Sequence, residues 1–309
     1  MSQAELRACR NASDLEQVVD LCDRAFDGTP REYFERHILR DPTLRPEDTL
    51  VIAKDGKLVS SVQIFPRKFW VEGRVMAFAG IGNVSTDPAE RKHGHAARLM
   101  EEAVKRMRSQ GYAFSMLTTT INSYYEKFGY VTVPRQAVTF TGVSPKRALG
   151  VRHFVQGSDF ASVRVIYESY NGENAGPVVR DEQYWLGQLD FCGEDPDKFL
   201  VLERDGRTVA YIRGNIEKGV LQVLEFGTLE DAPASFEAMV RSLASRSMGT
   251  PVKAVLSEGE LKRLALRMPH ALETDREMMI LVLDERERAT LERTILRPGV
   301  LMFWLSDFF

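Results

Sequence analysis

A glycine flanked by cations, between an apolar stretch and a helical pattern, is the part of the chain best suited to chemistry. Arg91, Gly94 and Ala96 have the spacing R-x-x-G-x-A, and Lys92 and Arg98 add positive charge. Glycine permits a left-handed backbone and a close approach to a ligand. The amides that follow open a helix, where unpaired N–H groups and the positive end of the dipole favour a phosphate. The spacing predicts a backbone cradle for a pyrophosphate, with an ordinary strand-to-helix turn as the alternative.

Length and composition indicate a globular protein of about two domains. The 309 residues are 44% hydrophobic and 28% charged, and the net charge of −3 argues against a nucleic-acid binder. The first ten residues are polar, unlike a signal peptide, and no apolar run of about 18 residues predicts a membrane helix. The cysteines are scattered, and no Cys/His spacing indicates a metal site. We expect a cytoplasmic protein without metal, in which Cys9, Cys22 and Cys192 are reduced thiols.

The chain contains a degenerate internal repeat. Residues 13–18 resemble 158–163 at an offset of 145, and 50–59 resemble 200–209 at an offset of 150. Each member of the second pair predicts two strands joined by an Asp-Gly hairpin turn. Each member of the first pair opens on Ser-Asp, which we expect to cap a helix. Two matches in the same order favour two copies of one fold, with a boundary between 144 and 151.

The first copy alternates strands and helices after its hairpin. The expected elements are a strand at 75–85, a helix at 96–107 ended by Gly111, a strand at 114–120, a short helix at 122–128 and a strand at 131–143. This order predicts an α/β fold with a mixed sheet flanked by helices. The expected domains are 1–147 and 148–284, followed at 285–309 by a helix and an apolar tail that packs toward the N-terminal domain.

Residues from Ala4 to Val143 resemble the GNAT superfamily of acyl-CoA-dependent N-acetyltransferases. The resemblance rests on the strand ending Val84-Ser85-Thr86, on the R-x-x-G-x-A spacing, and on Tyr125-x-Lys127-x-Gly129-Tyr130 about 30 residues later. The tandem arrangement is similar to the enhanced-intracellular-survival type of acetyltransferase. Relatives of that type usually carry a third, sterol-carrier-like domain, which we expect to be missing or severely shortened here, because only residues 285–309 follow the second copy.

The resemblance implies acetyl-CoA as the cofactor and assigns the residues that hold it. Backbone groups of Val84, Ser85 and Thr86 are expected to pair with the pantetheine arm. Arg91 and the amides of the following loop and helix are expected to take the pyrophosphate; these are Lys92, His93, Gly94, His95, Ala96 and Ala97. The side chains of His93 and His95 are interpreted as polar loop groups. Asn122 matches an asparagine that contacts the pantetheine or the reacting centre, with a helix N-cap as the alternative and Ser123 as its rival.

The second copy lacks the cradle. Residues 224–236 have no Arg and no Gly at the required spacing, and Glu230 and Asp231 would repel a pyrophosphate. We expect this copy to bind no CoA and to shape the acceptor cleft.

Tyr125 is the predicted general acid. A phenol with a pKa of about 10 stays protonated at neutral pH and can donate to a leaving thiolate. The alternative is that Tyr125 is a core aromatic. Its neighbour Tyr124 points elsewhere on a helix, and we expect one of the two tyrosines to be a packing residue, with Tyr125 as the functional one.

The general base is not evident on the strand before the cradle, because residues 76–83 contain no carboxylate. In the similar family the terminal carboxylate reaches the active site, which implies this role for Phe309. Water relayed through backbone carbonyls is the alternative base. For the apolar residues 301–309 themselves, the alternatives are a final edge strand or a dimer contact.

The acceptor is expected to be the primary amine of a small molecule, attacked directly in a ternary complex. Residues 26–44 lie where the family forms its acceptor wall; their carboxylates are Asp27, Glu32, Glu35 and Asp41. Three arginines nearby favour a solvated helix face instead. Alternatives for the whole protein are an acetyltransferase for proteins or peptides and a non-catalytic acyl-CoA sensor. A homo-oligomer is possible.

Overall fold

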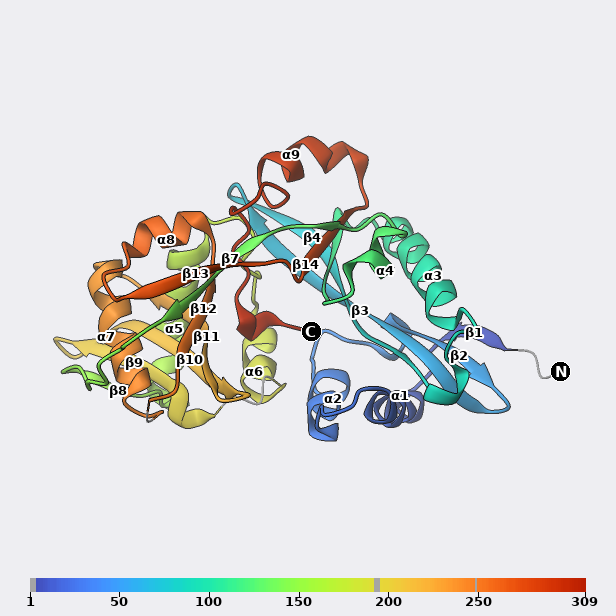
Figure 1. The fold of residues 1–309 in the computed structure, drawn as a ribbon, viewed down its shortest axis with the longest axis horizontal. Helices are drawn as coiled ribbons and strands as arrows, with labels where there is room; N and C mark the ends of the chain where they lie inside the picture. Colours follow the sequence, from blue (N-terminus) through green and yellow to red (C-terminus); the bar gives the residue numbers. More distant parts are fainter. Residues whose placement is uncertain (1–3, 192–194, 248) are drawn as a thin grey trace.

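The computed structural model describes residues 4–191, 195–247 and 249–309, which form two lobes with a seven-stranded sheet each (Figure 1). In spatial order, the first sheet contains β1 (Glu5–Ala8), β2 (Thr49–Lys54), β3 (Lys57–Val71), β4 (Arg74–Thr86), β5 (Phe114–Thr118), β14 (Met278–Val282) and β6 (Val131–Thr132). The second contains β13 (His270–Asp275), β7 (Arg135–Phe140), β12 (Val252–Leu256), β11 (Val220–Thr228), β10 (Arg207–Glu217), β9 (Phe199–Arg204) and β8 (Val151–His153). The expected mixed α/β architecture is confirmed. Cys192 lies outside the described residues.

Helices cover both faces of the sheets. They are α1 (Ala12–Ala25), α2 (Arg31–Leu39), α3 (His95–Ser109), α4 (Asn122–Glu126), α5 (Gln156–Asn171), α6 (Glu182–Phe191), α7 (Ala232–Ala244), α8 (Glu258–Leu264) and α9 (Arg288–Arg293). Short 3-10 turns are η1 (Pro46–Asp48), η2 (Pro88–Glu90), η3 (Pro196–Lys198), η4 (Glu285–Glu287) and η5 (Leu305–Asp307). Alternation along β2 shows the layering: Leu50 and Ile52 belong to the core under α3, and Val51 belongs to the core under α1 and α2. No helix among the described residues has the length and apolar character needed to cross a bilayer.

The two lobes exchange strands. β14 follows the second copy in sequence but lies between β5 and β6 of the first sheet, whereas β7 lies between β13 and β12 of the second (Figure 1). The single strand expected at 131–143 is therefore wrong: β6 and β7 join different sheets. Pro134 separates them, and proline cannot donate a ladder hydrogen bond. Each sheet thus takes one strand from the sequence range expected to form the other domain.

The internal repeat is visible in matching interactions. Arg7 donates to both carboxylate oxygens of Asp14 at 2.7 and 3.0 Å, and Arg152 does the same to Asp159 at 2.6 and 2.8 Å. The residue pairs are 145 apart, as the sequence repeat requires. The two Asp-Gly turns also match, with φ of 50° and 75° in the first copy and 49° and 72° in the second. Such positive φ values define the expected hairpin turns.

The expected Ser-Asp helix caps are wrong. α1 begins one residue before Ser13, and its cap is Asn11, whose side chain accepts from the Asp14 amide. α5 begins two residues before Ser158, with no side-chain cap hydrogen bond. Each aspartate instead binds the arginine seven residues before it and accepts the backbone N–H four residues before it, from Arg10 in the first copy and Val155 in the second, both at 2.8 Å.

Candidate active site

The first sheet opens where β4 and β5 diverge. The two strands pair in parallel from Phe78–Phe114 to Gly80–Met116, and β4 continues to Thr86. On its other side, β4 carries one extra residue against β3, and Asn83 in this bulge has φ of 50°. The predicted pantetheine-binding residues Val84, Ser85 and Thr86 lie on this last part of β4. Their strand runs beyond the β5 pairing, where an extended ligand could add to the edge.

The predicted cradle begins directly after β4, at η2 and the start of α3. Gly94 is the residue before α3, has φ of 76°, and gives the helix no side-chain cap hydrogen bond. A Cβ built on Gly94 would have no atom within 4 Å, so the glycine is required by backbone conformation and the space around it is open. His95, Ala96 and Ala97 open the helix. Their amides and the open space in front of them fit the phosphates of an acyl-CoA.

Some of the charged groups around the cradle already form contacts with other parts of the protein. The Arg91 guanidinium donates to the carbonyl oxygen of Ala25 at 3.0 Å, which ties the loop to the end of α1. Lys92 is exposed and has φ of 68°. His93 is exposed, as expected, but the interpretation of His95 as a loop group is wrong. His95 is the first residue of α3 and is 8% exposed, because its ring turns back toward Glu90.

Three side chains at the cradle bring possible metal ligands together, although the sequence showed no such spacing. Atoms of Glu90, His93 and His95 lie within 4.8 Å of one another. Lys54 already donates to Glu90 Oε1 at 2.7 Å, which places an ammonium on the same carboxylate. This cation competes with a metal ion, and the absence of a metal stays a prediction.

The corresponding helix of the second copy is closed to an anion. Asp231 caps α7, and its carboxylate accepts from the Ala234 amide at 2.8 Å. A carboxylate therefore occupies the helix N-terminus that Gly94 leaves uncapped in the first copy. This difference supports the expectation that the second copy binds no CoA.

Asn122 does not cap α4. The residue before α4 is Ile121, and it provides no side-chain cap hydrogen bond. The Asn122 amide group instead donates to Thr132 Oγ1 at 2.8 Å and to the Arg276 carbonyl oxygen at 2.9 Å. The N-cap interpretation is wrong for both Asn122 and Ser123, because the short helix begins at Asn122. Asn122 joins α4 to the turn that leads into β14, and its contact with a cofactor stays a prediction.

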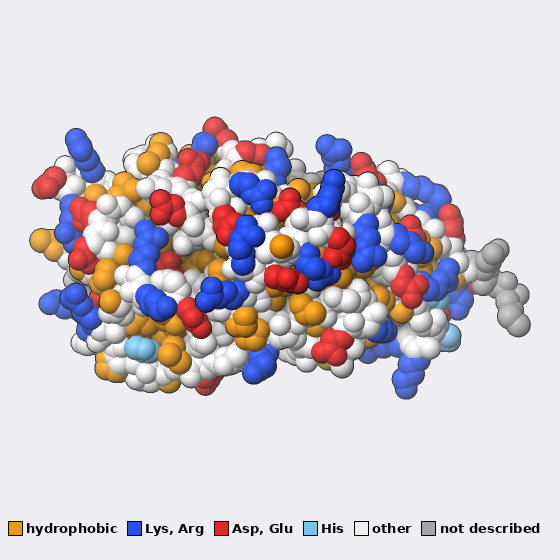
Figure 2. Space-filling view, turned by 90° about the horizontal axis from the view of Figure 1, so that it is seen from above, with side chains coloured by type: hydrophobic (Ala, Val, Ile, Leu, Met, Phe, Trp, Pro, Cys, Tyr) orange, Lys and Arg blue, Asp and Glu red, His pale blue; other side chains and the backbone are white. Residues whose placement is uncertain are grey.

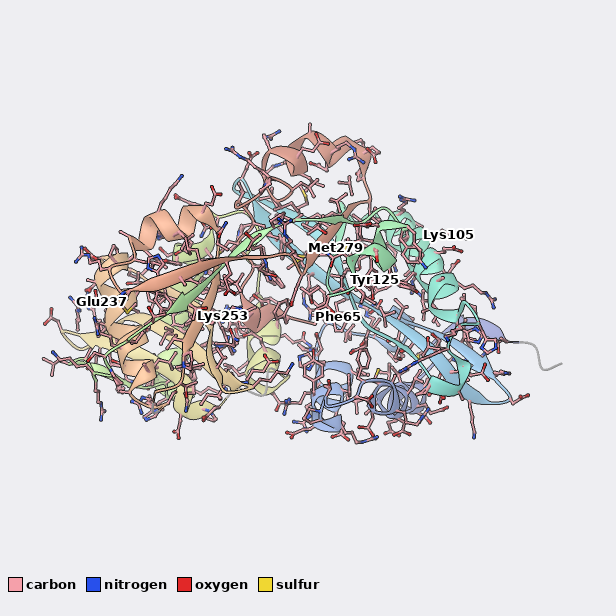
Figure 3. The ribbon with its side chains drawn as sticks, in the orientation of Figure 1. Phe65, Lys105, Tyr125, Glu237, Lys253 and Met279 are labelled. Carbon is pink, nitrogen blue, oxygen red and sulfur yellow. The ribbon has the colours of Figure 1, made fainter. Side chains whose placement is uncertain are left out.

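Tyr125 lies on α4 in the apolar core beside α3 (Figure 3). Burial raises its pKa to about 12, and the adjacent Tyr124 adds to the shift, so the phenol keeps its proton at any physiological pH. Tyr124 packs edge-on against it at 5.0 Å between ring centres. The Tyr124 hydroxyl is buried without a hydrogen-bond partner among the described residues. The assignment of the acid to Tyr125 rather than Tyr124 stays a prediction.

The apolar C-terminal tail is buried, but it is not an edge strand. Leu301, Met302, Phe303 and Trp304 are each 1% exposed, and the chain then makes the turn η5. Figure 1 shows the C-terminus between the two lobes. The Phe309 ring stacks on Phe65 of β3 at 5.2 Å between ring centres. The tail thus carries the chain end onto β3 and β4 of the first sheet.

Two glycines on β4 make room for Phe309, and sequence reasoning overlooked them. A Cβ built on Gly80 would lie 2.5 Å from the Phe309 ring, and one on Gly82 would lie 3.1 Å from the terminal carbonyl carbon and oxygen. Glycines two residues apart in a strand indicate close approach of another group on one face. Phe309 therefore occupies the space that side chains at positions 80 and 82 would fill.

The carboxylates of the expected acceptor wall are largely neutralised. On α2, Arg36 donates to Glu32 at 2.7 Å and Arg31 to Glu35 at 2.8 Å. Arg31, Glu32 and Glu35 face solvent, whereas Arg36 is largely buried, so the interpretation of a solvated helix face holds for three of these four side chains. Asp41 differs, because it is buried and forms an ion pair with Arg67 of β3, 1% exposed like the aspartate.

Residues 6–133 match the family model described as an acetyltransferase (GNAT) domain. This range includes the opening of the sheet, the cradle and Tyr125. Residues 6–133 form a GNAT acetyltransferase domain. The presence of this domain supports an acyltransferase enzyme. Among curated proteins, no sequence matches the chain.

Solved structures extend the GNAT fold over both lobes. A probable N-acyltransferase from Enterococcus faecalis has a TM-score of 0.72 at 20% identity, covering 92% of this chain and 73% of that one. Eis1 from Mycobacterium abscessus has a TM-score of 0.66 at 16% identity, covering 93% and 76%. The N-myristoyltransferase of Saccharomyces cerevisiae, solved with myristoyl-CoA, has a TM-score of 0.60 at 14% identity, covering 91% and 79%. At these identities the likeness concerns the fold.

Proposed function

We propose that the chain transfers an acetyl group from acetyl-CoA to the primary amine of a small molecule. The observation that carries the proposal is the position of the Phe309 carboxyl against Gly82, two residues beyond the last parallel pair of β4 and β5. The terminal carboxylate of Phe309 could therefore act as the base at β4, where residues 76–83 contain no carboxylate. The charges over the surface in Figure 2 are interspersed, which suits a small acceptor better than an extended polyanion.

The chain's own groups would divide the work as follows. The last part of β4 holds the pantetheine arm, and the amides of Gly94, His95, Ala96 and Ala97 hold the pyrophosphate. Acetyl-CoA supplies an electrophilic thioester carbon and a thiol leaving group. The Phe309 carboxylate accepts a proton from the amine, whose nitrogen forms the new C–N bond as the C–S bond breaks. Tyr125 donates its proton to the departing sulfur.

A panel of acceptors tests this function. The expected result is release of free CoA thiol from acetyl-CoA with small primary amines, together with a mass increase of one acetyl group on the amine. Tertiary analogues of the same amines are the matched controls, because they have no N–H to replace. Turnover with peptides alone would favour a protein acetyltransferase. Binding of acetyl-CoA without turnover on any acceptor would favour a sensor, and either result would contradict the proposal.

A further inference from the structure

The second lobe has an opening equivalent to the active site of the first. β11 and β12 pair in parallel only as far as Val223–Ala254, and β11 continues to Thr228. Two residues beyond the last parallel pair lies Glu225, at the place that Gly82 has on β4. The cross-strand neighbour of Glu225 is Arg213. The first copy therefore has an empty glycine position where the second has a buried carboxylate.

The C-terminal tail fills this second opening. Arg180 donates to Asp307 at 3.0 and 2.7 Å, and it also forms an ion pair with Glu225. Tyr184 donates its hydroxyl to Asp307 at 3.0 Å, and Gln188 donates to Asp307 at 3.1 Å. The side chains of Arg180, Glu225 and Asp307 are all 0% exposed. We call Arg180, Tyr184, Gln188 and Glu225 the tail socket.

The charges of the tail socket favour the binding of one carboxylate from the tail. Burial alone would raise the pKa of Glu225, but the charges of Arg180 and Arg213 hold it below its ordinary value. Arg180 therefore lies between two carboxylates, Glu225 of the second lobe and Asp307 of the tail. A buried ion pair with several hydrogen bonds fixes a geometry more than it adds stability.

The anchored residue is only two positions from the end of the chain. Two extended residues span about 7 Å, so the Phe309 carboxyl can move only a short distance when Asp307 is fixed. The Phe308 amide donates back to Leu305 at 3.3 Å, which tightens the turn further. A tail fixed at Asp307 in the second lobe must therefore place its end at Gly82 in the first.

We infer that the opening of the second lobe serves as a socket that positions the terminal carboxylate in the active site of the first. Asp307 and Arg180 are then positioning residues, which act through Phe309 and touch neither acetyl-CoA nor the acceptor. The inference rests on the proposed role of Phe309 as the base. The inference gives a function to the second copy, in which Asp231 caps the N-terminus of α7 and leaves no helix terminus free for a cofactor.

The variant Asp307→Asn tests the socket by two independent readouts. The first is the rate at which carboxypeptidase A releases phenylalanine from the native protein, because release requires the end to leave its site. The second is kcat for acetyl transfer to the most active amine of the panel. We expect release at least tenfold faster, kcat at least tenfold lower, and an unchanged KM for acetyl-CoA. Tyr184→Phe, which keeps the ring and removes one hydrogen bond, should shift both in the same direction by a smaller factor.

Asp159→Asn is the matched control, because Asp159 also binds an arginine bidentately in the second copy but lies away from the tail. It should leave phenylalanine release and kcat within twofold of the unmodified chain. Unchanged release in both Asp307→Asn and Tyr184→Phe would overturn the socket. Faster release with unchanged kcat would instead show that the end is anchored but is not the base, which overturns the proposed role of Phe309 and with it the positioning role.

Discussion

Replacing the terminal carboxylate of Phe309 by a carboxamide is expected to lower kcat for acetyl transfer by about 100-fold or more. An alkylamine with a pKa of about 10.4 is roughly 0.1% neutral at pH 7, so the reaction depends on a group that removes its proton. Within residues 76–83 of β4 there is no carboxylate, and the chain end lies against Gly82. The amide keeps the ring stacked on Phe65 and removes only the charge.

Peptide ligation can supply this chain end, with the natural carboxylate installed by the same route as the control. The Kd for acetyl-CoA should be the same in both proteins, because the cradle is on α3. The measurement is kcat with the best amine across pH 6 to 9. Equal kcat for the amide and the carboxylate would assign the proton to a water relay instead.

Tyr125→Phe is expected to lower kcat by about 100-fold while leaving the Kd for acetyl-CoA within twofold. The change removes the hydroxyl proposed to protonate the thiolate and keeps the ring in the core beside α3. Since burial raises the pKa of Tyr125 to about 12, its ionisation should not appear in a pH–rate profile below pH 10.

Tyr124→Phe is the matched control for this prediction. It removes a neighbouring hydroxyl that is buried without a partner among the described residues, so kcat should change by less than threefold. Stopped-flow or steady-state thiol release measures both variants. A large loss in Tyr124→Phe with little change in Tyr125→Phe would exchange the roles of the two tyrosines. Equal losses of turnover and cofactor affinity in Tyr125→Phe would mean that Tyr125 is structural.

Local signals in the sequence were sufficient for the left-handed turn before α3 and for the two hairpin turns of the repeat. Gly94 predicts a left-handed residue before a helix, and Asp55-Gly56 and Asp205-Gly206 predict hairpin turns; all have the positive φ values expected. These features depend on the backbone preferences of a few adjacent residues. These features can therefore be predicted without knowing how the rest of the chain folds.

Long-range partners were not predictable in the same way. The exchange of β7 and β14 depends on which sheet edge each strand meets, and alternating or apolar strands fit many edges. The pairing of Arg180 with Asp307 joins residues 127 apart. Only the paired glycines at 80 and 82 gave a local sign that another group approaches β4, and that sign does not identify Phe309.

A calorimetric titration with acetyl-CoA tests most directly the claim that one of the two copies holds the cofactor. We predict one site per chain, and an affinity at least tenfold weaker in Gly94→Asp, whose carboxylate would stand at the uncapped start of α3. Gly206→Asp is the control, because Gly206 also has positive φ and open space around it but lies in the hairpin of the second copy. Two sites per chain, no binding at millimolar acetyl-CoA, or equal affinity in Gly94→Asp and the unmodified chain would contradict the claim.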